Sequence, residues 1–102
     1  MVTELKESNF DSFIEENKKV LIDCWAPWCG PCRRMGPIIE EIDAGQKDFA
    51  VAKLNTDENQ SISVRFNINA IPTLLIFKDG VLAKTLVGLR PKDEILSAVN
   101  GA

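Results

Sequence analysis

The sequence predicts an α/β fold in which a mixed central β-sheet is flanked by helices on both faces, a three-layer α/β/α sandwich. Short apolar runs typical of buried strands alternate with segments whose apolar residues recur at helical spacing, and strands joined through helices pair in parallel by right-handed crossovers. Asp79-Gly80 separates two further apolar runs and is typical of a tight hairpin, which makes those two strands antiparallel. We expect a single domain over residues 1–102, because a chain of this length has room for one hydrophobic core and shows no linker or repeat.

The first helix and strand are predicted from two neighbouring segments. Apolar residues recur at helical spacing between residues 10 and 17, and Ser8 with Asp11 resembles a capping box at the start of this helix. Residues 20–25 form a short apolar run that suits a strand buried on both faces. A weak edge strand is expected before them, near Val2.

The second helix is expected after a turn rich in Pro and Gly at residues 26–32, and it should end near Gly45. We predict a kink near Gly36, which precedes Pro37 inside the helix, because glycine and proline are the two poorest helix formers.

The second half of the chain predicts a strand, a short helix, the hairpin and a last helix. The short helix could be capped by Asp57 or Asn59, and Pro91 lies where the first turn of the last helix should begin. The strands are expected at residues 49–54, 73–78 and 81–87.

Composition excludes several classes of function. The chain has 12 Lys and Arg against 15 Asp and Glu, and its longest basic cluster is Arg33-Arg34, so we expect no nucleic-acid partner. It contains no histidine, which removes the commonest metal ligand and general base. The N-terminal segment lacks the apolar core of a signal peptide, and no run is long enough to cross a bilayer. We therefore expect a cytoplasmic protein without a membrane partner.

Chemistry is expected at Cys29-Gly30-Pro31-Cys32, which follows a buried strand and opens a helix. Two cysteines at this spacing can bring their sulfurs within bonding distance, and the positive end of the helix dipole favours a thiolate on the first. A thiolate is the species that attacks a disulfide. The second cysteine lies one turn further in, should be more buried, and can attack the mixed disulfide to release the reduced substrate. Such a pair needs no cofactor, because the electrons reside on the sulfurs.

Two other interpretations of the pair remain open. A structural zinc site needs four N or S ligands, and only Cys24 is left to join the pair, so a metal would have to be shared between two chains. A purely structural disulfide would close too small a loop to restrain the unfolded chain much. The redox interpretation is favoured because the pair, the helix start and the βαβ setting coincide.

Two segments of the chain resemble the landmark motifs of the thioredoxin family: Trp28-Cys29-Gly30-Pro31-Cys32 and Ala70-Ile71-Pro72-Thr73. The resemblance extends from about Phe10 to Val99 and includes Asp23, Lys53 and Gly88 in register. It implies the thioredoxin fold and a monomeric protein-disulfide reductase in which Cys29 is the attacking thiolate and Cys32 the resolving thiol. The implied partners are disulfide-containing proteins and a separate thioredoxin reductase that restores the dithiol.

Asp23 and Lys53 are charged residues within otherwise apolar strands. A buried carboxylate without a partner is costly and tends to keep its proton. If the two strands are neighbours, the simplest account is that the charges meet; the alternative is that both lie at frayed strand ends in water. The resemblance implies that Asp23 lies beneath the cysteines and exchanges protons with Cys32 through water. We therefore predict a raised pKa for Asp23, tuned by Lys53.

Pro72 precedes a strand, where proline is often found only because it cannot donate a hydrogen bond to the sheet. The resemblance implies a cis peptide bond there, and an Ile71 backbone that pairs with an extended substrate segment. Trp28, Ile71, Pro72 and Gly88 would line this substrate groove, whereas the alternative for Trp28 and Ile71 is ordinary core packing. Cys24 stands where many thioredoxins have an aromatic residue, and we expect it to be inert packing.

Two rival functions are also compatible with the fold. Oxidases and isomerases on this scaffold usually carry histidine between the cysteines, and Gly30-Pro31 argues against them. A binding module would use the fold by contact alone, without turnover.

Overall fold

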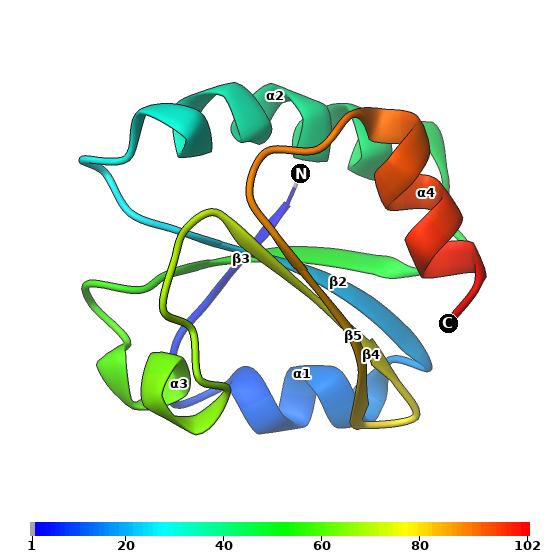
Figure 1. Cartoon of the computed structure of the whole chain (residues 1–102). Coiled ribbons are helices and arrows are strands. Elements are labelled where there is room, and N and C mark those ends of the chain that lie inside the picture. The colour runs from blue at the N-terminus through cyan, green and yellow to red at the C-terminus, as the bar shows by residue number, and fades with distance from the viewer. Residues whose placement is uncertain (1) are drawn as a thin grey trace.

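The computed structural model describes residues 2–102 and contains a five-stranded sheet and four helices. The strands are β1 (Thr3–Leu5), β2 (Lys19–Trp25), β3 (Ala50–Asn55), β4 (Thr73–Lys78) and β5 (Val81–Val87). The helices are α1 (Phe10–Glu16), α2 (Gly30–Gly45), α3 (Gln60–Arg65) and α4 (Lys92–Asn100). Figure 1 shows the sheet between two layers of helices, with α2 and α4 on one face and α1 and α3 on the other. The predicted three-layer sandwich is confirmed.

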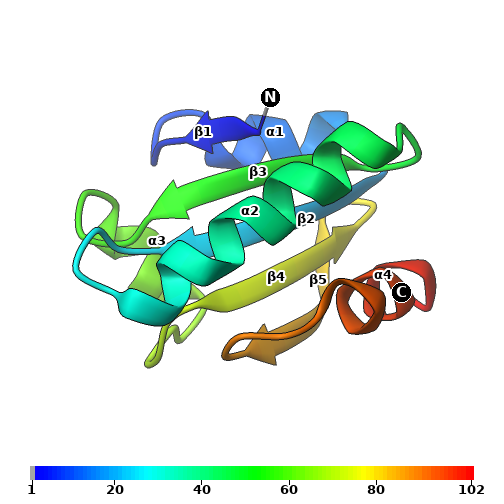
Figure 2. The ribbon, with the colours of Figure 1, turned by 90° about the horizontal axis from the view of Figure 1, so that it is seen from above.

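The sheet is mixed, as predicted, with the strand order β1-β3-β2-β4-β5. β3 pairs in parallel with both β1 and β2, whereas β4 runs antiparallel to β2 and to β5. The turn between β4 and β5 has positive φ at Asp79 (53°) and Gly80 (80°), the conformation that a two-residue hairpin favours. Figure 2 shows the strands fanning out beneath α2 and α4. β2 therefore lies at the centre of the sheet, and the chain passes from the end of β2 through a short turn into α2.

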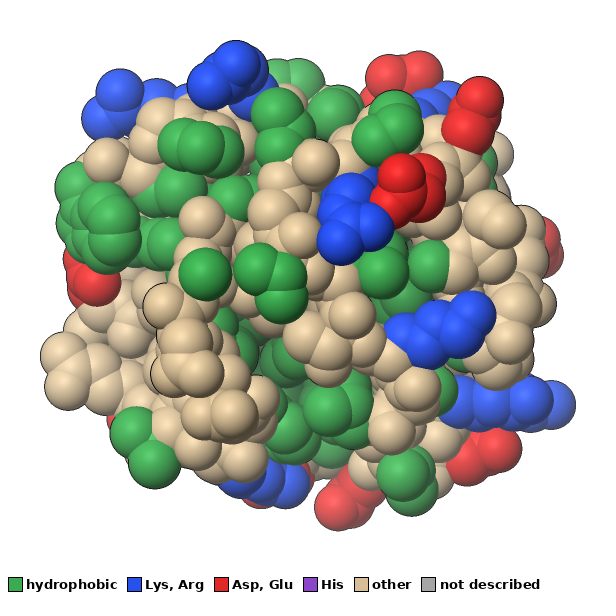
Figure 3. Space-filling model, viewed as in Figure 1, with side chains coloured by type: hydrophobic (Ala, Val, Ile, Leu, Met, Phe, Trp, Pro, Cys, Tyr) green, Lys and Arg blue, Asp and Glu red, His purple; other side chains and the backbone are tan. Residues whose placement is uncertain are grey.

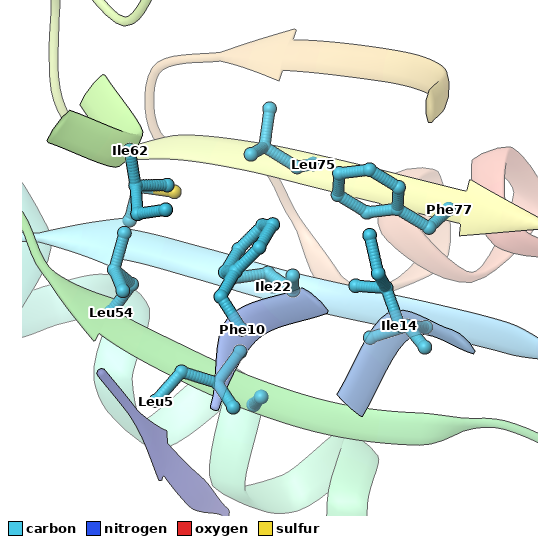
Figure 4. Packing of buried hydrophobic residues seen from close by; sticks show 11 residues of the cluster. Leu5, Phe10, Ile14, Ile22, Leu54, Ile62, Leu75 and Phe77 are labelled. Atoms are coloured by element: carbon cyan, nitrogen blue, oxygen red, sulfur yellow. The ribbon is translucent and has the colours of Figure 1, made fainter. Parts of the chain in front are cut away.

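Successive side chains of β2 point to opposite faces of the sheet. Val20, Ile22 and Cys24 pack into the cluster that α1 and α3 cover, and Figure 4 shows Phe10 of α1 and Phe77 of β4 within this cluster. Leu21 packs into the second cluster, with residues of α2 and α4. By the same alternation Asp23 lies on the face that α2 covers.

The structure corrects the expected start of α1 and specifies the starts of α4 and α3. The capping box at Ser8 is wrong: Asn9 is the N-cap of α1, and its Oδ1 accepts a hydrogen bond from the backbone N–H of Lys6 at 2.8 Å. This bond closes a turn that contains Ser8, so the helix begins after it. Pro91 is the N-cap of α4 and not its first residue. Of the two candidates for α3, the N-cap is Asn59, but its side chain makes no capping bond.

α2 is assigned as one helix through Gly36 and Pro37, and the kink expected there stays a prediction. Within residues 2–102, no helix has both the length and the apolar composition that crossing a membrane requires.

Candidate active site

The cysteine pair lies where β2 leads into α2. Cys29 is the N-cap of α2, and its Sγ accepts a hydrogen bond from the backbone N–H of Cys32 at 3.2 Å. A disulfide joins the two residues, whose Cα atoms are 5.2 Å apart. The first N–H groups of a helix have no partner within the helix, so one of them is directed at the leading sulfur. The same donor and the helix dipole stabilise a thiolate at Cys29 once the disulfide is reduced.

The expectation that Cys32 is more buried than Cys29 is wrong for the oxidised state. Both residues have an exposed fraction of 5%. Cys29 is covered because its Sγ lies 3.8 Å from the carbonyl oxygen of Ile71, in the loop that precedes β4. This loop therefore contributes to covering the leading sulfur.

The loop before β4 brings Ile71 and Pro72 near the disulfide, and Gly88, which follows β5, is bonded to this loop. The Ile71–Pro72 peptide bond is cis, as the resemblance implied. The N–H of Gly88 donates to the carbonyl oxygen of Pro72 at 2.8 Å, and Gly88 has φ of 93°, a conformation that glycine adopts without the strain of a side chain. The Ile71 carbonyl contacts Cys29, so these contacts link the cysteine pair through Ile71 and Pro72 to Gly88.

Trp28 stands at the rim of the site and is not a core residue. Its side chain is 69% exposed, and its Nε1 donates to Oδ2 of Asp57 at 2.9 Å. With Ile71 and Thr56 it lines a hollow of about 340 Å³. Hydrophobic side chains gather on the left of Figure 3, the end of the molecule where Figure 1 shows α2 beginning. The sequence suggested Asp57 only as a helix cap, so its contact with Trp28 was missed.

Asp23 is buried beneath the pair, with 4% of its surface exposed. It lines a second cavity, of about 240 Å³, together with Cys32, Lys53, Arg33 and Trp25. Its Oδ1 has no hydrogen-bond partner among the described residues. Burial raises the pKa of Asp23 to about 7, and the attraction of Lys53 offsets only part of that effect. The raised pKa predicted for Asp23 is therefore supported by its surroundings.

Lys53 is placed beside Asp23 by the backbone register but does not form an ion pair with it. The two residues are paired across β2 and β3, so the two strands are neighbours, which was the condition for the two charges to meet. The ion pair recorded for Lys53 among the described residues is with Glu4 of β1, at 3.9 Å, and its Nζ lies 5.8 Å from the ring centroid of Trp25. The two charges therefore share a cavity and attract each other but are not in direct contact, because Lys53 lies between Glu4 of β1 and Asp23 of β2 and its ammonium group pairs with Glu4.

Cys24 is buried on the opposite face of the sheet from the disulfide, in the cluster covered by α1 and α3. Burial raises the pKa of its thiol, and the neighbouring charge of Asp23 raises it further. A buried thiol that stays protonated is a poor nucleophile, which supports the prediction that Cys24 is inert packing.

Comparison with known proteins gives one consistent family. The family model described as Thioredoxin matches residues 1–101. The chain is 47% identical over 92 residues to a thioredoxin of Alicyclobacillus acidocaldarius subsp. acidocaldarius, covering 89% of this chain and 88% of the other. It is 41% identical over 101 residues to a thioredoxin of Pyropia yezoensis, covering 97% and 94%. Among solved structures, a mutant thioredoxin from Halobacterium salinarum NRC-1 matches with a TM-score of 0.91 at 34% identity, covering 97% of this chain and 88% of that chain.

Proposed function

Because the chain belongs to the thioredoxin family, we propose that Cys29 attacks, Cys32 resolves and Asp23 moves the proton between them. The protein is a thiol–disulfide oxidoreductase that reduces protein disulfides, and a separate reductase restores its dithiol, as is general in the family. The observation that carries the division of roles is the backbone N–H of Cys32, directed at the Cys29 sulfur from the start of α2.

The reaction has two exchanges. The Cys29 thiolate attacks one sulfur of the substrate disulfide, the substrate S–S bond breaks, and the sulfur that leaves takes up a proton from water. Cys32 then gives its proton to the Asp23 carboxylate, and its sulfur attacks Sγ of Cys29 in the mixed disulfide. The second substrate sulfur leaves and is protonated, and the Cys29–Cys32 disulfide forms. The substrate gains two electrons from the enzyme sulfurs and two protons; one proton comes from water, and the other balances the Cys32 proton that Asp23 accepts and then releases.

Asp23 serves this scheme because it shares a cavity with Cys32 and has a pKa of about 7. A general base is most effective when its pKa lies near the working pH. Only the ionised carboxylate can accept the proton, so resolution should accelerate as pH rises through about 7. Lys53, in the same cavity, is proposed to tune that value.

The substrate groove is proposed to consist of Trp28, Ile71, Pro72 and Gly88, around the active-site loop that contains Gly30 and Pro31. The exposed ring of Trp28 and the Ile71 carbonyl beside Cys29 support this assignment. An extended substrate segment would add to Ile71 as a strand adds to a sheet edge, which gives affinity through main-chain hydrogen bonds and little side-chain specificity.

We further propose a monomer that works in the cytoplasm as a single domain over residues 1–102. Every group of the proposed site comes from one chain, so the proposed reaction does not need a second copy of the protein. A dithiol that must be kept reduced suits a reducing compartment.

The test is to trap the mixed disulfide. Cys32→Ser should form a covalent one-to-one adduct with insulin whose disulfides are intact, visible by mass spectrometry and cleaved by dithiothreitol, because the resolving sulfur is missing. Cys29→Ser should form no adduct and show no turnover. Cys24→Ala is the control and should keep turnover within about twofold, since that thiol lies across the sheet. Turnover by Cys29→Ser, or trapping through Cys24, would refute the assignment.

A further inference from the structure

Three ionisable side chains form a row across three neighbouring strands: Glu4 in β1, Lys53 in β3 and Asp23 in β2. The backbone register pairs Glu4 with Lys53, and Lys53 with Asp23. Side chains at paired positions of neighbouring strands point to the same face of a sheet. The row therefore runs from the sheet edge to the cavity beneath the cysteines, with the cation between two carboxylates.

The lysine in this row is paired with the outer carboxylate. Its Nζ lies 3.9 Å from Oε1 of Glu4, and the two side chains are 37% and 40% exposed. Asp23, at the inner end, is 4% exposed, and its Oδ1 has no hydrogen-bond partner among the described residues. The ammonium group thus stays with the partner that is hydrated, although the buried carboxylate lies on the adjacent strand.

We propose that Glu4 is a positioning residue for disulfide reduction: by pairing with Lys53 it holds the ammonium group toward the sheet edge and away from Asp23, and so sets how readily Asp23 exchanges its proton. This role rests on the proposed function of Asp23 as the proton acceptor of Cys32. Glu4 itself touches neither sulfur nor substrate; it acts through the lysine.

Removing the charge of Glu4 lowers the pKa of Asp23 by two routes that have the same sign. One negative charge near the carboxylate disappears, and Lys53 loses the partner that competes with Asp23. Attraction by Lys53 already lowers the pKa of Asp23 against the effect of burial, so a closer ammonium lowers it further.

The other charged groups around Asp23 leave this direction unchanged. From α2, Arg33 lines the same cavity, but its guanidinium donates to the Pro27 carbonyl oxygen at 3.0 Å. Cys32, also from α2, is held in the disulfide, and β4 places the apolar Leu74 opposite Asp23.

The experiment is a titration of Glu4→Gln in the oxidised protein, followed through the side-chain carboxyl ¹³C shift of Asp23. Cys29 and Cys32 do not titrate in the disulfide and the chain has no histidine, so few groups change charge near neutral pH. We expect the midpoint to fall by roughly 0.3 to 0.6 pH unit, the size of effect that a half-exposed ion pair supplies. The pH profile of the resolving step should move by the same amount, and Glu4→Asp should give a smaller shift.

The matched control is Glu41→Gln. Glu41 also pairs with a lysine, Lys92, at 2.9 Å, so this substitution causes the same change in net charge and breaks the same kind of contact. It lies near the other end of α2, and the midpoint of Asp23 should move by less than about 0.1 pH unit. Equal shifts in the two variants would overturn the proposal, because they would show an effect of net charge alone.

Lys53→Met distinguishes an effect of Glu4 on Asp23 that acts through Lys53 from a direct effect of the Glu4 charge. On its own it should raise the midpoint of Asp23. In that background Glu4→Gln should shift the midpoint by less than half of its effect in the unmodified protein, because the group it positions is gone. An undiminished shift, or no shift from Glu4→Gln in either background, would overturn the proposal.

Asp23→Asn distinguishes a failure of the role proposed for Glu4 from a failure of the role proposed for Asp23 as the proton acceptor. If that variant still shows a pH profile with a midpoint near 7 for the resolving step, Asp23 is not the proton acceptor and the proposed function fails at that point. If the profile disappears in Asp23→Asn but is unmoved in Glu4→Gln, only the role of Glu4 is refuted.

Discussion

The two faces of the central sheet are built from the same strands but differ in what they bury. The face under α1 and α3 is closed by apolar residues, among them three aromatic rings whose centroids lie 5.3 to 5.8 Å apart, Phe10, Phe66 and Phe77. The face under α2 and α4 is equally apolar at Leu21, Val51 and Ile76, but its end beside the disulfide contains a carboxylate and a cavity. One face supplies stability along its whole length, and the other gives up some stability at one end.

Asp23 and Cys24 show the contrast within two consecutive residues of β2. Both are buried, and burial raises the pKa of each. Asp23 opens into the cavity beside Cys32, so its proton can be exchanged, whereas Cys24 is enclosed by the cluster on the other face. The comparison teaches that burial alone shifts a pKa, but a shifted group takes part in chemistry only where the packing leaves a path to it.

The largest effect is expected from opening the closed face. Phe10→Ala should lower the free energy of unfolding by about 3–5 kcal/mol, because the ring is fully buried and its removal leaves a cavity beside Phe66 and Phe77. Denaturant unfolding measures this, with Val64→Ala, 81% exposed, as a control that should change by less than about 0.5 kcal/mol. The folded variant should keep the titration of Asp23, and a displaced midpoint would show that the faces are coupled.

A comparable effect, with a pH dependence, is expected from Asp23→Asn. The pKa of Asp23 is raised from 3.8 to about 7, so the folded protein holds this proton more tightly than the unfolded chain does. The stability that the group contributes is complete below about pH 4 and is lost as pH rises through about 7. Asparagine does not ionise, so the advantage of Asp23→Asn over the unmodified protein should grow by up to about 4 kcal/mol between those pH values.

The measurement is the free energy of unfolding of both proteins, in the oxidised state, at several pH values. The other carboxylates contribute equally to both, so the difference isolates Asp23. A difference that does not change with pH would mean that the carboxylate is better solvated than its position beneath the disulfide suggests.

The smallest effect is expected at Cys24. Cys24→Ser should cost about 1–3 kcal/mol, because it places a hydroxyl without a partner in an apolar cluster. In the oxidised native protein the thiol should resist iodoacetamide and become reactive only on unfolding, which mass spectrometry of labelled protein can follow. Labelling under native conditions as fast as that of a free cysteine peptide would show that this face opens.

Much of the fold could be predicted from local patterns. The buried strands β2 and β4 are mostly apolar runs, interrupted within β2 only by Asp23, and Asp79-Gly80 has the residues that positive φ demands, so both strand bounds and the hairpin follow from the sequence. The helix starts were harder. Both Ser8 and Asn9 are suitable N-cap residues for α1. Asn9 is the N-cap because its side chain closes a turn with Lys6, and the spacing of apolar residues does not predict this turn.

The site divides in the same way. The cysteine pair and Pro72 were predicted because their motifs are contiguous in the sequence. The partner of Lys53 could not be predicted, because the pairing depends on β1 lying beside β3. β1 is an edge strand of three residues, which is too short to show a pattern that would predict its neighbour. The sequence therefore did not single out Glu4, although it shares a row with Asp23.

Both edges of the sheet discourage further pairing. At one edge β1 is only 3 residues long, and at the other β5 carries the half-buried Lys84 and a register shift against β4 between Ile76 and Phe77. Short edge strands, inward lysines and bulges all hinder the addition of a foreign strand. A crowded solution of this protein should therefore resist fibril growth, and the backbone beside the disulfide is the place where we propose that another chain adds.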